Sequence, residues 1–93
     1  MIIAVRYDYD PEQDLSIVRP AHRQFLRGLL DAGSLLASGP LPRSNGALII
    51  LSGDSPEAAL QLLEADPFLA AGCILRRTAE EWDPVLGVLA PKG

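Results

Sequence analysis

The chain has 93 residues, of which 48% are apolar, and this length and composition predict a single domain over residues 1–93 with a packed core. Its formal net charge is −4, and its eight basic residues are spread among twelve acidic ones, so we expect no nucleic-acid partner. The sequence contains no run of about 18 apolar residues for a membrane span, and it begins with a strand-like segment instead of a basic leader. These features predict a soluble, cytoplasmic protein without a membrane partner.

The first predicted element is a strand over residues 1–9, because apolar side chains alternate along it until Asp10-Pro11 ends it. Acidic residues occupy every second position at the end of this strand and in the loop that follows: Asp8, Asp10, Glu12 and Asp14. This spacing is that of the start of a calcium-binding loop, but Gln13 stands where such a loop needs glycine and Arg19 where it needs a bidentate glutamate. We therefore expect a solvated loop and no metal site.

The second predicted element is a helix over residues 20–33, since Pro20 suits a first turn and Gly33 suits a left-handed end. Ser16 is expected to cap an extra leading turn. His22, the single histidine, borders the apolar stripe of this helix. The stripe consists of Val18, Ala21, Phe25 and Leu29, with Leu26 and Leu30 beside them. A half-sheltered imidazole titrates near neutrality and suits a general base or acid, but it can also simply fill the edge of the core.

The second half of the chain predicts a hairpin, a helix and a last strand. Residues 34–38 form a strand that Gly39-Pro40 closes, and residues 47–52 form the next strand after a turn at 42–46. A helix begins at Ser55-Pro56, and a short helical turn then begins at Asp66-Pro67. Residues 73–80 form the fourth strand, and the apolar tail, 82–93, is expected at a sheet edge or a dimer interface.

The predicted order is β-α-β-β-α-β, which with right-handed crossovers gives a ferredoxin-like α+β domain. We expect a four-stranded antiparallel sheet in the spatial order 4-1-3-2, with both helices on one face. Two helices cover only one face, whereas several strands carry apolar residues on both faces. The second face of the sheet therefore needs a partner.

Three short motifs resemble the YciI (YCII-related) family of the dimeric α/β barrel superfamily. They are Arg19-Pro20-Ala21-His22-Arg23, Leu36-Ala37-Ser38-Gly39-Pro40 and Ala65-Asp66-Pro67-Phe68. The resemblance spans nearly the whole chain. It implies a homodimer that packs sheet on sheet, and an active site whose histidine and aspartate fall on His22 and Asp66.

The predicted topology brings the same residues together independently of this resemblance. The first helix begins, and the second helix finishes, at the end of the sheet where the first strand ends, so His22 and Asp66 share that end. We predict His22 and Asp66 as catalytic residues, although Asp66 before proline is also an ordinary helix cap. The predicted substrate-binding residues are Tyr7, Ser38, Gly39 and, for an anionic substrate group, Arg19.

This set of residues favours an enzyme that works by proton transfer without a cofactor. The sequence shows no metal-binding cluster, no glycine-rich phosphate loop and no candidate cofactor lysine. Elimination or isomerisation, of the lyase or isomerase type, ranks before hydrolysis, because no oxyanion signature or nucleophile elbow is visible. The alternatives are a non-catalytic ligand-binding or regulatory module that uses the same pocket, and a purely structural dimer.

Overall fold

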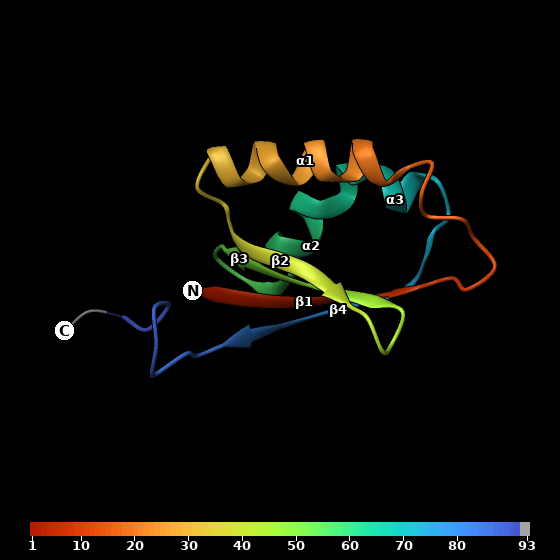
Figure 1. Ribbon diagram of the computed structural model, residues 1–93. Coiled ribbons are helices and arrows are strands. Elements are labelled where there is room, and N and C mark those ends of the chain that lie inside the picture. Colours follow the sequence, from red (N-terminus) through yellow and green to blue (C-terminus); the bar gives the residue numbers. More distant parts are fainter. Residues whose placement is uncertain (92–93) are drawn as a thin grey trace.

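Four strands form one antiparallel sheet, and the helices lie together on one of its faces (Figure 1). The structure is a computed structural model that describes residues 1–91. The elements are β1 (Ile2–Tyr9), α1 (Arg19–Asp31), β2 (Leu35–Leu41), β3 (Gly46–Ser52), α2 (Pro56–Leu62), the 3-10 turn η1 (Leu63–Ala65), α3 (Pro67–Ala70) and β4 (Ile74–Trp82). The strand order β2-β3-β1-β4 is the predicted order read from the other edge, so the ferredoxin-like α+β fold is confirmed.

The core lies between the helices and the sheet and follows the period of two along the strands. In β1 the side chains of Ile3, Val5 and Tyr7 are fully buried, as the alternation predicted. Ile49 and Leu51 of β3 are buried on the same face, opposite these residues in the register. The helices complete the core with Leu26 of α1, Ala59 of α2 and Leu63 of η1.

The second strand differs from the prediction, which ended it at Ser38. Gly39 and Pro40 lie inside β2 and pair with Leu48 and Ala47 of β3. β2 is an edge strand, and a proline without an N–H is tolerated where one side of the strand has no neighbour. The prediction was wrong because Gly39-Pro40 was taken to end the strand, although the predicted sheet order already placed this strand at an edge, where proline is tolerated.

The buried stripe of α1 also differs from the predicted one. His22 and Leu26 are its buried residues, whereas Ala21 is exposed, so His22 belongs to the centre of the stripe and not to its border. Val18 precedes the helix without a side-chain cap, and the hydroxyl of Ser16 donates to Asp14 instead of capping the helix. The predicted cap at Ser16 is therefore wrong.

Two turn positions explain how neighbouring elements approach each other. Gly33 follows α1 with φ +83°, which confirms the predicted left-handed end of the helix. Asn45 has φ +50°, and Gly46 follows it with its Cα so close to β1 that an added Cβ would collide with the carbonyl oxygen of Tyr7. The Asn45-Gly46 turn therefore sets the register of β3 on β1.

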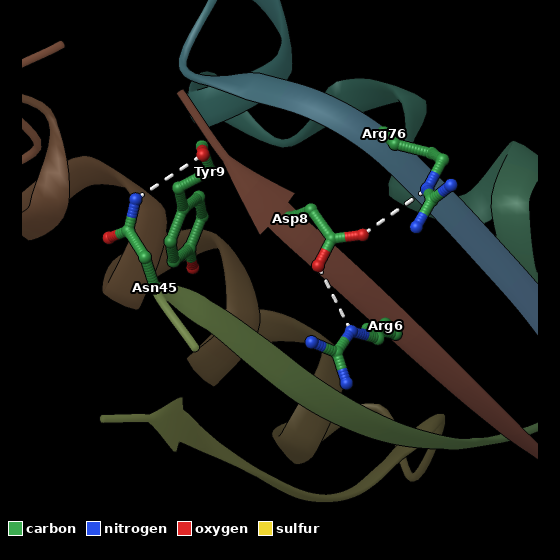
Figure 2. A network of polar contacts seen from close by, with 5 residues as sticks. All are labelled: Arg6, Asp8, Tyr9, Asn45 and Arg76. Carbon is green, nitrogen blue, oxygen red and sulfur yellow. Dashed lines mark hydrogen bonds and ion pairs between the residues drawn. The ribbon is translucent and has the colours of Figure 1, made fainter. Parts of the chain in front are cut away.

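The face of the sheet opposite the helices, here called the open face, is partly apolar and partly charged. By the strand register its apolar residues include Ile2, Ala4, Leu48, Ile50 and Trp82. Figure 2 shows its charged part, in which Asp8 accepts hydrogen bonds from Arg6 at 3.0 Å and Arg76 at 3.3 Å. The bond from Arg6 is the main reason why the pKa of Asp8 lies below its usual range.

The tail after β4 exposes several apolar side chains, notably Val85, Leu86 and Val88. Pro84 is buried, and together with Leu89 it lines a hollow beside Met1. Residues 92 and 93 of the predicted 82–93 tail lie outside the described residues. Among residues 1–91, no helix combines the length and the apolar composition needed to cross a membrane.

Candidate active site

His22 and Asp66 form a buried pair between α1 and the start of α3. The Nδ1 atom of His22 lies 2.9 Å from both carboxylate oxygens of Asp66. The histidine is 7% exposed and the aspartate is fully buried, so His22 is more sheltered than the sequence indicated. The two residues are 44 positions apart in the chain, and the topology brings them to one end of the sheet, as predicted.

Asp66 also caps α3 and holds a tyrosine of β1. Its Oδ1 atom accepts the backbone N–H of Phe68 at 3.0 Å, and its Oδ2 atom accepts the hydroxyl of Tyr7 at 2.9 Å. Asp66 is therefore both a helix cap and the partner of the imidazole, which were the two roles weighed from the sequence. Because the carboxylate accepts from Nδ1–H, it leaves Nε2 as the ring nitrogen for a substrate.

An aromatic wall fixes the plane of the imidazole. The ring of Phe68 stacks on His22 with their centroids 4.1 Å apart and their planes 22° apart. The ring of Tyr9 packs on Phe68 in an edge-to-face contact, with the two ring centroids 5.4 Å apart. The Asp66 bond and the Phe68 stack together leave the histidine ring one orientation.

A cavity of about 320 Å³ adjoins this histidine. Its walls include the apolar side chains of Leu26, Ile49 and Phe68. Five lining residues carry polar side-chain groups: Tyr9, Arg19, His22, Arg23 and Ser38. An apolar concave site of this size with a few polar groups suits a single-ring or similarly small compound.

A bulge in β2 places Ser38 at this cavity. Leu35 pairs with Leu51 and Ser38 pairs with Ile49, because the register shifts by one residue between Leu35 and Ala37. A regular strand would turn Ala37, not Ser38, to the face of Leu35. Gly39 lines the cavity beside Ser38, so both residues lie within reach of a small molecule bound in the cavity.

The predicted substrate-binding residues divide into two groups in the structure. Arg19, Ser38 and Gly39 line the cavity together with His22. Tyr7 is absent from the cavity lining among the described residues; it is fully buried, and its hydroxyl donates to Asp66. Tyr9 occupies the position expected of Tyr7.

Sequence reasoning missed Tyr9, Arg23 and Phe68 as cavity residues. Two signals were available: Tyr9 follows Tyr7 by one strand period, and Arg23 and Phe68 stand inside the motifs that contain His22 and Asp66.

Both tyrosines of the chain are held in the neutral form. Burial, and then the negative charge of Asp66, raise the pKa of Tyr9 to about 12 and raise the pKa of Tyr7 still further above its ordinary value. Tyr7 therefore stays a hydrogen-bond donor to Asp66 and does not serve as a base at neutral pH.

These pKa shifts predict the behaviour of the protein in alkali. An unfolded tyrosine ionises near pH 10, so the stability that both groups contribute is complete below pH 10; the part from Tyr9 is lost as the pH rises through about 12, and the part from Tyr7 is lost at still higher pH. We expect the ultraviolet absorbance of tyrosinate to stay low at pH 10 in the folded protein. Half-ionisation of either tyrosine near pH 10, with the circular dichroism still native, would contradict this assignment. Tyr7→Phe and Tyr9→Phe identify which ring responds.

The family of the chain follows from its match to a known domain model. The model of the YCII-related domain matches residues 1–83. The chain belongs to the YCII-related domain family. Protein YciI from Escherichia coli O6:H1 and protein YciI from Shigella flexneri are each 43% identical to this YCII-related chain over 65 residues. That alignment spans 59% of the chain and 66% of each relative, slightly under two thirds of their length.

A solved structure also shares the fold of this YCII-related domain. It is 5-chloro-2-hydroxyhydroquinone dehydrochlorinase (TftG) from Burkholderia phenoliruptrix AC1100, in complex with 2,5-dihydroxybenzoquinone. The TM-score is 0.76 and the sequence identity is 21%, with 89% of this chain and 94% of that chain covered. The likeness shows the same ferredoxin-like fold.

Proposed function

We propose that this YCII-related protein is a cofactor-free enzyme that eliminates or isomerises a small molecule by proton transfer through His22 and Asp66. One observation carries the proposal: Asp66 holds Nδ1 of a buried histidine that also lines a cavity of substrate size. A histidine held in this way keeps one ring nitrogen, Nε2, that the carboxylate does not bind.

The chemistry begins with neutral His22, whose Nδ1–H is bonded to Asp66. Nε2 takes a proton from the substrate, the electrons of the broken bond form a new double bond, and in an elimination the leaving group departs with its own electron pair. In an isomerisation the imidazolium returns the proton to a different substrate atom. The Asp66 carboxylate stabilises the imidazolium between these steps, and the Ser38 hydroxyl is placed to bind a carbonyl or hydroxyl of the substrate.

The structural neighbour supports elimination as the first reaction to test. TftG is named a dehydrochlorinase and was solved with a quinone ring compound. A cavity with one aromatic wall and a single proton-transfer group fits the same reaction class on a ring of similar size. Hydrolysis ranks lower, because it also needs donors aimed at a developing oxyanion.

The test of this function is chloride release from chlorinated hydroquinones, beginning with 5-chloro-2-hydroxyhydroquinone. We expect the wild-type protein to release chloride faster than buffer does, and His22→Gln to remove this excess. Ring compounds that bind, as shown by a raised melting temperature, without any turnover would instead support the alternative of a ligand-binding or regulatory module.

We further propose that two copies pack through the open face of the sheet. Leu48 is 40% exposed near the centre of that face, beside the charged group around Asp8, and the tail adds further apolar side chains. Burying this area against a second copy removes apolar surface from water and covers the side of the sheet that no helix covers in residues 1–91.

Leu48→Glu is expected to convert a micromolar dimer into a monomer, as measured by sedimentation velocity, because it places a charge in the apolar interface. Leu62→Glu is the matched control, since Leu62 is 37% exposed but belongs to α2 on the helical side. A folded wild-type protein that sediments as a monomer would overturn the dimer.

A further inference from the structure

Three arginines follow one another along one side of α1 at intervals of four residues. This arginine row consists of Arg19, Arg23 and Arg27. Residues four apart lie on the same helix face, with their Cβ atoms about 5–6 Å from each other. The row concentrates three positive charges on a protein whose formal net charge is −4.

Acidic side chains do not neutralise the arginine row. The ion pairs found among residues 1–91 that involve arginine join Arg6, Arg76 and Arg77 to acids, and none involves the row. Asp14 lies close enough for the charge of Arg19 to contribute, after the hydrogen bond from Ser16, to lowering its pKa, but none of the ion pairs found within residues 1–91 joins Asp14 to Arg19. Like charges four residues apart repel each other, so an anion bound between them would relieve this repulsion.

The row begins at the active-site cavity and leads away from it. Arg19 and Arg23 line the cavity that contains His22. The same two arginines also line an outer groove of about 530 Å³ on the surface of α1, which continues to Arg27. Arg27 lines the groove but not the cavity, so Arg19 and Arg23 stand where the two spaces meet.

We propose that the substrate is a small organic anion whose carboxylate or similar oxyanion is bound by Arg19 and Arg23 at the mouth of the cavity. Its uncharged ring or chain then lies against Phe68, with the reacting atom near Nε2 of His22. Guanidinium groups bind planar oxyanions through paired hydrogen bonds, and the apolar walls behind them strengthen those bonds. This substrate class rests on the proposed function for its reacting end, and Arg23 becomes a specificity-determining residue.

The experiment measures binding of two probes that differ in charge but hardly in shape, benzoate and benzamide, by titration calorimetry at constant ionic strength. Benzoate is expected to bind the wild-type protein at least about tenfold more tightly than benzamide, the scale of one charge-assisted hydrogen bond. Arg23→Gln is expected to lower the affinity for benzoate by about tenfold and to leave that for benzamide unchanged. Arg23→Lys keeps the charge but loses the paired geometry, and should fall between the two.

Arg27→Gln is the matched control, because it removes the same charge from the same helix one turn away from the cavity. Its affinity for benzoate should stay within about twofold of the wild type, since an exposed charge farther from the ligand is screened by salt. Three results would each overturn the proposal. They are an equal loss of benzoate affinity in the Arg23 and Arg27 variants, an equal affinity of the wild-type protein for benzoate and benzamide, and no benzoate binding to the wild type at millimolar concentration.

These outcomes separate the anion site from the proposed reaction. Arg23-dependent benzoate binding without turnover of any hydroquinone would keep the anion site and overturn the enzyme. Turnover of a hydroquinone by a protein that binds benzoate no more tightly than benzamide would keep the enzyme and overturn the anion site. Circular dichroism shows whether each variant is folded, and Arg23 is exposed at the surface, so its replacement removes no buried contact.

Discussion

Asp66→Ala is expected to lower the free energy of unfolding by about 3–5 kcal/mol, the usual cost of removing one partner of a buried charged pair. The substitution leaves the Tyr7 hydroxyl, the backbone N–H of Phe68 and Nδ1 of His22 without their acceptor in the protein interior. Since domains of this kind are stable by only about 5–15 kcal/mol, the loss is a large part of the total. Urea unfolding followed by circular dichroism measures it.

Tyr7→Phe is the natural comparison for Asp66→Ala. It removes one hydrogen bond to the carboxylate without leaving a buried donor unpaired, so we expect a smaller cost of about 1.5–3 kcal/mol. The double variant should lose less unfolding free energy than the two single variants lose together, because both substitutions remove the same contact between Tyr7 and Asp66. A cost below about 1 kcal/mol for Asp66→Ala would show that the pair contributes little to the stability of the fold.

His22→Ala is expected to lower kcat by about a hundredfold or more, which is the usual scale for the loss of a general base. The reason is that Nε2 is the group proposed to take the proton, and the cavity offers no other base in the lining described here. KM should change much less than kcat, since the apolar walls and the arginines still bind the substrate. Steady-state kinetics with the chlorinated hydroquinone found in the turnover screen gives both constants.

The His22 experiment needs a variant that keeps the volume of the ring site, because His22 is buried and stacks on Phe68. His22→Gln fills more of this space and still accepts or donates a hydrogen bond, yet it transfers no proton at neutral pH. Both variants should lose kcat together. Activity that survives within a few fold in a folded variant would refute His22 as the base and favour the ligand-binding module.

The order of elements, the sheet topology and the pairing of His22 with Asp66 were predictable because each depends on local signals. Prolines and caps mark where helices begin, and the period of two marks the strands. Right-handed crossovers then allow one sheet order and bring the start of α1 and the start of α3 to the same end. A histidine and an aspartate placed at those two starts had to become neighbours.

Other features were decided only by tertiary structure, because they depend on contacts between distant parts of the chain. Ser38 reaches the cavity because a bulge shifts the register of β2 on β3. The hydroxyl of Tyr7 reaches Asp66, 59 residues away, and this contact leaves Tyr9 to line the cavity. The alternation along a single strand predicts which residues share a face. Only the packing of the helices on that face decides that Tyr7 contacts the Asp66 carboxylate and that Tyr9 lines the cavity.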